Sequence, residues 1–154
     1  MAGRIDARLK ELGLELPAPN APVANYVPYV VTGNLVFISG QVSMAGSEKI
    51  TGTVGQDLSV EQGQAAARLC ALTILAQAKA ACGGDLDRVK RCVKLGGFVA
   101  SGPDFKDHPK VINGASDLLV EVLGDAGRHA RFAVGVPALP LGFAVEIDAV
   151  FEIA

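Results

Sequence analysis

The sequence predicts an α+β domain in which a mixed β-sheet carries two helices on one face. Its 154 residues, half of them hydrophobic, suffice for one domain with its own core. After a short leading helix, the predicted elements run β-β-(β)-α-β-α-β-β. Two helices cannot cover both faces of a sheet of about five or six strands. The other face is therefore left to solvent or to another subunit.

The first third of the chain predicts a helix, a connector and a hairpin. Apolar residues at helical spacing indicate a short helix over residues 2–13, ended by Gly13. Three prolines in residues 16–25 break regular structure, so this segment is expected to be an extended connector. Residues 26–42 are β-rich on both sides of Thr32-Gly33-Asn34, which predicts a β-hairpin.

Two longer helices are expected further along. Ser59 and Gln62 have the spacing of a capping box, and the Ala- and Leu-rich stretch after them ends at Gly83. A second helix is predicted from near Pro109, a favoured first-turn residue, to Gly124.

The remaining segments are predicted strands and one loop. Small and polar residues over 43–56 indicate a loop that holds one short strand around 50–54. Strands are predicted over 88–101, 130–136 and 143–153. The last two are joined by PALPLG.

Composition narrows the class of protein. The net charge of −2 gives no electrostatic reason to expect nucleic acid or an acidic membrane surface as a partner. The start has no apolar core like that of a signal peptide, and no run of about 18 apolar residues occurs. Three cysteines without C-x-x-C spacing indicate reduced thiols in a cytoplasmic protein, with Cys82 the most exposed.

The strand that contains Arg131 raises the main functional question, because burying a charge is costly unless it is paired. Alternation places Arg131 with Ala133 and Gly135, and we expect this to be the face without helices. If the last two strands pair, Glu146 and Asp148 share that face. A guanidinium matches a carboxylate bidentately, which favours an anion site. A structural Arg131–Glu146 pair, or an ion pair between subunits, fits the alternation equally well.

Other chemical motifs are sparse. The sequence has no metal-binding His/Cys spacing, Walker A motif, G-x-G-x-x-G fingerprint or G-x-S-x-G elbow, so no metal or cofactor is expected. Ser39-Gly40 ends an apolar strand, where a hydroxyl and exposed amides can line a cleft, although simple strand termination explains it too. Tyr26 fits a cleft rim or an interface. Gly114, inside a helical pattern, indicates a close backbone approach.

Together, YVPYVVTGNLVFISGQV, INGASDLL and ARFAVGV…LPLGFAVEIDAV resemble the RidA/YjgF/UK114 family of reactive-intermediate deaminases. The resemblance covers residues 24–154, preceded by the helix and connector of residues 1–23. It implies a chorismate-mutase-like fold and a homotrimer with clefts between subunits. It also implies cofactor-free hydrolysis of 2-imino acids, or their enamine tautomers, to 2-oxo acids and ammonia.

The resemblance also implies roles for individual residues. Arg131 corresponds to the arginine that binds the substrate carboxylate, Glu146 to the acidic residue that positions or activates water, and Tyr26 to the cleft tyrosine. The remaining substrate-binding positions are Ser39, Gly40 and Asn113. Many family members carry a cysteine where this chain has Ala133, which argues against a thiol-based role.

Three functions follow as hypotheses. The first is a deaminase of small carboxylated imines, and the second is a non-catalytic trimer that binds 2-oxo acids or similar metabolites through Arg131. An endoribonuclease, the activity in an older family name, is disfavoured by the acidic net charge and the lack of a basic, aromatic-lined groove. A trimeric scaffold without chemistry is the remaining alternative.

Overall fold

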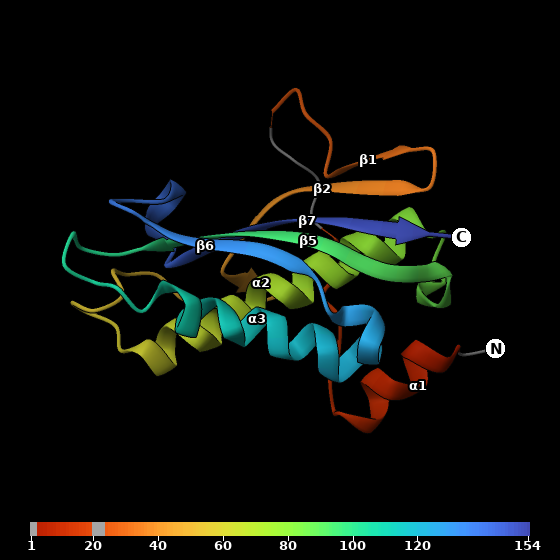
Figure 1. Cartoon of the computed structure of the whole chain (residues 1–154), viewed down its shortest axis with the longest axis horizontal. Helices are drawn as coiled ribbons and strands as arrows, with labels where there is room; N and C mark the ends of the chain where they lie inside the picture. The colour runs from red at the N-terminus through yellow and green to blue at the C-terminus, as the bar shows by residue number, and fades with distance from the viewer. Residues whose placement is uncertain (1–2, 20–23) are drawn as a thin grey trace.

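The computed structural model describes residues 3–19 and 24–154 of the chain. A five-stranded sheet lies at its centre in the order β1-β2-β7-β5-β6 (Figure 1). The strands are β1 Tyr29–Thr32, β2 Leu35–Val42, β7 Val145–Ile153, β5 Val89–Ala100 and β6 Ala130–Val136. Neighbouring strands are antiparallel except β5 and β6, which are parallel, so the sheet is mixed as predicted.

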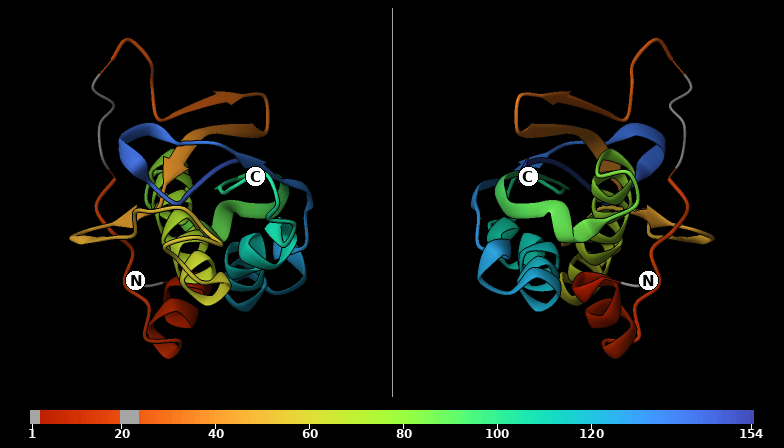
Figure 2. Two further views of the ribbon diagram at one scale, coloured as in Figure 1. Left: turned by 90° about the vertical axis from the view of Figure 1, so that its left-hand side faces the viewer. Right: turned by 90° about the vertical axis from the view of Figure 1, so that its right-hand side faces the viewer.

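Both long helices lie on one face of the sheet (Figures 1 and 2). They are α2 Val60–Ala81 and α3 His108–Leu123, and the predicted α+β, chorismate-mutase-like architecture is confirmed. The leading helix α1, Arg4–Glu11, is shorter than expected and contacts α3; residue 2 lies outside the described residues. None of the described helices is both long and apolar enough to span a lipid bilayer.

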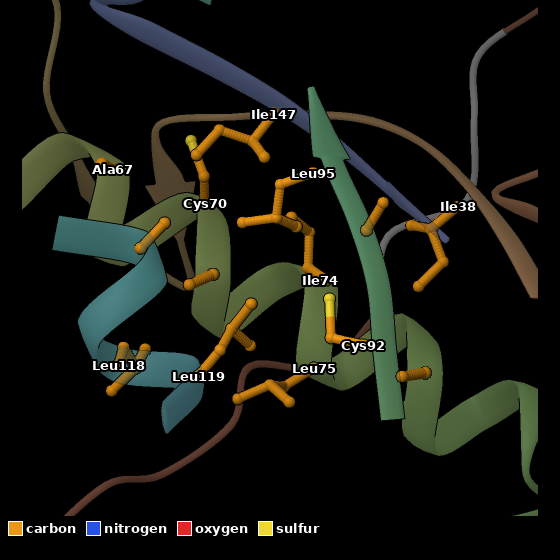
Figure 3. Packing of buried hydrophobic residues seen from close by; sticks show 14 of the residues in the cluster. Ile38, Ala67, Cys70, Ile74, Leu75, Cys92, Leu95, Leu118, Leu119 and Ile147 are labelled. Atoms are coloured by element: carbon orange, nitrogen blue, oxygen red, sulfur yellow. The ribbon is translucent and has the colours of Figure 1, made fainter. Parts of the chain in front are cut away.

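The hydrophobic core lies between the helices and the sheet (Figure 3). Ile74 of α2, Leu119 of α3, Leu95 of β5 and Ile147 of β7 are all fully buried there. All three cysteines are buried free thiols. The expectation that Cys82 is exposed was wrong, because Leu86 and Val89 of the following turn belong to the same buried cluster.

Local signals place the start of α2 and its contact with α3. The Ser59 hydroxyl accepts a hydrogen bond from the Gln62 amide, and the Gln62 side chain accepts one from the Ser59 amide, so the predicted capping box is present. The predicted close approach at Gly114 is also present, since a Cβ there would meet the backbone carbonyl of Gln64 on α2.

The segment 43–56 differs from its prediction. It contains a small hairpin of β3 Met44–Ala45 and β4 Glu48–Lys49, whereas the expected strand around 50–54 is reduced to isolated bridges. The backbone explains the difference: Gly52 and Gly55 have φ angles of 130° and 88°, which interrupt an extended strand.

The last two strands do not pair with each other, so the condition under which Arg131 and Glu146 would share a face is not met. Strand β6 follows β5 through helix α3, and strands joined by such a crossover pair in parallel. Strand β7 then joins the opposite side of β5, which therefore separates β6 from β7.

The face assignment of β6 was also wrong. Arg131 points toward α3, where it donates to the Ser116 hydroxyl at 3.0 Å and to the Pro109 carbonyl at 3.2 Å. Phe132 and Val134 lie on the face without helices, with exposed fractions of 38% and 42%. Hydrophobicity misled the assignment because β6 is an edge strand, and α3 approaches its small residues while the larger ones face outward.

Candidate functional site

Helix α3 holds the half-buried Arg131 at the edge of the sheet. Its hydrogen bonds to the Ser116 hydroxyl and the Pro109 carbonyl engage one N–H on each terminal nitrogen. A guanidinium carries five N–H donors. Among the described residues, this leaves Nε–H and one N–H on each terminal nitrogen, which is enough for a bidentate contact with a carboxylate.

Asn113 lies on the same side of α3 as Ser116, because residues three apart share a helix face. Both line a shallow hollow of about 260 Å³ beside Arg131. The rest of the lining consists of Asp117, Val120, Arg128 and His129. The structure thus brings together two of the predicted ligand-binding residues, Arg131 and Asn113.

A second group forms around a β-bulge in β2. Ile38 pairs with Ala149 and Gln41 pairs with Ile147, so Ser39 and Gly40 together oppose the single residue Asp148. Ser39-Gly40 therefore marks a bulge within β2 rather than the simple end of the strand. Sequence alternation alone could not locate it.

The bulge also holds the segment that contains Tyr26. The Ser39 hydroxyl donates to the Val27 carbonyl at 2.8 Å, and the Ser39 amide donates to the Pro28 carbonyl at 2.9 Å. Tyr26 therefore lies beside the bulge, just before β1, with 56% of its surface exposed. The structure brings Tyr26 and Ser39 to one region, as expected of two residues of one site.

Glu146 completes this second group. Its carboxylate lies against Gly40, where a Cβ would collide with it, so the glycine makes room for the acid. Burial, and to a lesser extent the nearby charge of Asp148, raise the pKa of Glu146. Within residues 3–19 and 24–154, no hydrogen bond or ion pair engages this half-buried carboxylate. An acid in this state is available to exchange a proton.

The two groups do not meet within one chain. Arg131 is paired with Leu95 on β5, whereas Glu146 is paired with Phe98, three residues further along that strand. Strand β5 separates them laterally by two strand spacings, roughly 10 Å, and they lie on opposite faces of the sheet. This geometry excludes the intramolecular Arg131–Glu146 ion pair.

Sequence reasoning missed two features near Arg131. Ser116 and His129 contact each other at 2.9 Å, although they lie thirteen residues apart on different elements. An apolar hollow of about 490 Å³ lies beyond Pro109, where the His108 ring occupies the space over Gly135. No sequence motif marks either, because both depend on how α3 docks against β6.

Two other observations concern the rest of the described surface and its titratable side chains. A hollow of about 660 Å³ between the connector, the β3–β4 hairpin and α2 contains none of the predicted site residues. Among the described residues, no three His, Cys, Asp or Glu side chains are grouped as metal ligands would be.

Comparison with known proteins relates this geometry to one family. Over residues 6–152, the chain matches the family described as "YjgF/chorismate mutase-like, putative endoribonuclease". It is 52% identical over 156 residues to protein TCP17 of Trypanosoma cruzi, covering 99% of this chain and 96% of that one.

Solved structures agree with this match. Atu1372 of Agrobacterium tumefaciens, a protein of unknown function, is 53% identical with a TM-score of 0.91, covering 97% of this chain and 92% of that one. The structure of E. coli TdcF with bound serine is 26% identical with a TM-score of 0.62, covering 89% and 94% respectively.

Proposed function

The chain belongs to the YjgF/RidA family, and on that premise we propose that it hydrolyses small carboxylated imines or enamines to 2-oxo acids and ammonia. The observation that carries the proposal is the placement of Arg131. Its guanidinium is held by α3, three N–H groups remain for a ligand, and Asn113 lines the same hollow. A planar 2-imino acid offers a carboxylate that suits this fork.

The proposed site contains residues from two copies of the chain. Arg131 and Asn113 belong to one copy, and Tyr26, Ser39, Gly40 and Glu146 to its neighbour. The apolar residues on the open face of the sheet support such an assembly, because exposed apolar surface of this kind marks an interface. They include Val30, Phe37, Phe132 and Val134. We propose a homotrimer, in which each interface completes one site.

The chemistry needs water, a proton acceptor and a proton donor. Arg131 would hold the substrate carboxylate and so present one face of the C=N bond to a water molecule. As that water attacks the imine carbon, Glu146 would accept one of its protons and pass it to the nitrogen, which gives a carbinolamine. Glu146 would then take the proton of the new hydroxyl and pass it to the nitrogen as the C–N bond breaks, so that a 2-oxo acid and ammonia are released. Its raised pKa makes the Glu146 carboxylate a stronger proton acceptor than an ordinary glutamate. Tyr26, which lies beside the bulge, would assist with a hydrogen bond.

A non-catalytic binder of 2-oxo acids or similar metabolites is the second candidate. The observation that favours it is the bound serine in the structure of TdcF, a small ligand with a carboxylate. Both candidates use Arg131 in the same way, and turnover separates them. Cleavage of RNA that survived Arg131→Ala would instead support a nuclease site elsewhere in the molecule.

The test couples the protein to a threonine dehydratase, which releases 2-iminobutyrate, and follows formation of 2-oxobutyrate. We expect the wild type to accelerate formation of 2-oxobutyrate. Arg131→Ala should lower this activity by at least about tenfold, and Arg91→Ala should leave it unchanged. Arg91 is an exposed arginine on β5, paired with Glu152, and serves as the matched control. Wild type that binds 2-oxobutyrate without accelerating its formation would support the binder and contradict the deaminase.

A further inference from the structure

Ser116 lies between the His129 imidazole and the Arg131 guanidinium. Its hydroxyl oxygen is 2.9 Å from His129 Nε2 and 3.0 Å from Arg131 Nη1. The other ring nitrogen, Nδ1, is 2.6 Å from the carbonyl oxygen of Gly127. Four groups from α3, β6 and the turn between them therefore form one chain of contacts.

The chemistry of the end groups fixes the direction of every hydrogen bond in this chain. A carbonyl oxygen only accepts, so His129 Nδ1 carries a hydrogen and donates to Gly127. In the neutral ring, Nε2 is then an acceptor and receives the Ser116 hydroxyl hydrogen. The Ser116 oxygen is left with its lone pairs toward Arg131, which can only donate.

The surroundings of His129 favour this neutral form. Burial is the main cause that lowers the pKa of His129, the hydrogen bond to the Gly127 carbonyl offsets part of this effect, and the charge of Arg131 lowers the pKa further. The other charged side chains at this hollow are Asp117 of α3 and Arg128 of the preceding turn. Arg128 is paired with Asp125, which offsets part of its charge.

We propose that Ser116 and His129 position Arg131, and that a carboxylate bound to Arg131 is coupled through them to proton uptake by His129. The inference rests on the proposed function only in taking Arg131 as the carboxylate ligand. The residues act through Arg131 and are positioning residues rather than catalytic ones.

The coupling has a defined sign. A carboxylate on Arg131 offsets the positive charge that disfavours protonation of His129, so binding raises the pKa of His129. The contact to Arg131 survives protonation, because the Ser116 oxygen has two lone pairs and can accept from both neighbours. Its own hydrogen then turns to a backbone carbonyl of the preceding helical turn. By linkage, carboxylate affinity rises as pH falls through the pKa of His129.

The experiment measures the dissociation constant of 2-oxobutyrate by calorimetry at several pH values, with proton uptake obtained from buffers of different ionisation enthalpy. Ser116→Ala removes the hydroxyl, and we expect it to weaken binding by about tenfold, as for loss of a hydrogen bond to a charged group. Ser116→Thr keeps the hydroxyl and restores most of the affinity. Ser101→Ala, which removes the Ser101–His108 contact of 3.1 Å, is the matched control and changes affinity by less than about twofold.

Two variants of His129 separate positioning from proton coupling. Glutamine reaches Ser116 with an acceptor that does not titrate, so His129→Gln keeps the affinity at neutral pH and loses the pH dependence. Asparagine reaches only the Gly127 carbonyl, so His129→Asn loses the affinity at neutral pH as well as the pH dependence. Circular dichroism and thermal unfolding confirm that each variant is folded.

The outcomes separate this inference from the proposed function. Binding by Ser116→Ala within twofold of wild type would overturn the positioning role, and pH dependence retained in His129→Gln would overturn the coupling. Ser116-dependent binding without turnover would contradict the deaminase and leave the inference standing. Turnover combined with carboxylate binding that does not depend on Ser116 would support the deaminase and overturn the inference. Absence of any carboxylate binding would overturn both the deaminase and the inference.

Discussion

At the scale of single residues, the absence of a side chain at Gly40 leaves the space that the Glu146 carboxylate occupies. Any Cβ at Gly40 would occupy the space of the Glu146 carboxylate. Without it, the acid lies half-buried beside the bulge, near the like charge of Asp148. Removing a carboxylate from water without pairing it destabilises its charged form. The proposed proton acceptor is therefore held at a cost to the stability of the fold.

That cost predicts how stability depends on pH. The pKa of Glu146 is raised above its ordinary value of 4.5, so the folded protein binds this proton more tightly than the unfolded chain. The penalty is absent below the unfolded value and grows as pH rises through the folded one. We expect Glu146→Gln to have a higher Tm than the wild type at about pH 8, and the difference to vanish toward pH 4.5.

Differential scanning calorimetry of both proteins across this pH range is the measurement. A Glu146→Gln variant less stable than the wild type at about pH 8 would mean that a partner group stabilises the carboxylate, which contradicts the unpaired acid described above.

At the scale of elements, helix α3 connects the core to the site. One side of α3 packs its buried residues into the core, while Asn113 and Ser116 lie toward Arg131 on β6. The position of α3 is set by its contact with α2 at Gly114, where only a residue without a side chain fits against the Gln64 carbonyl. Packing at this crossing thus determines where Arg131 is held.

Gly114→Ala tests this crossing because the two physical effects have opposite signs. In a helix free of contacts, alanine would stabilise by up to about 1 kcal/mol relative to glycine. The collision with α2 should instead lower the free energy of unfolding by about 1–3 kcal/mol in urea titrations. Asp117→Ala, an exposed substitution on the same helix, should change it by no more than about 0.5 kcal/mol. Stabilisation by Gly114→Ala would contradict the close approach.

The elements differ in how far the sequence predicts them. Local signals sufficed for the Ser59 capping box, the end of α2 near Gly83 and the turn at Gly33, because each depends on a few adjacent residues. The β5–α3–β6 crossover and the orientation of Arg131 depend on contacts distant in sequence. Alternation separated the two faces of β6 but could not say which one α3 covers. The Ser116–His129 pair was missed for the same reason.

At the scale of the whole molecule, the two halves of the proposed site explain why the face without helices carries exposed apolar side chains. Arg131 and Glu146 lie on opposite faces and are separated by β5, so one small ligand cannot reach both in one chain. Phe132 and Val134 are exposed on the open face, where a second copy would cover them. The proposed site therefore requires an assembly in which neighbouring copies supply different halves.

Complementation between two inactive variants shows whether neighbouring copies share each site. Arg131→Ala and Glu146→Gln subunits are mixed in equal amounts, unfolded and refolded together, and assayed for 2-oxobutyrate formation. In a cyclic assembly with each site shared by two copies, roughly one quarter of the sites regain both wild-type residues, so the mixture should recover about a quarter of wild-type activity. Activity in a refolded mixture that stays at the level of the separate variants, while refolded wild type is active, would contradict a site shared between copies.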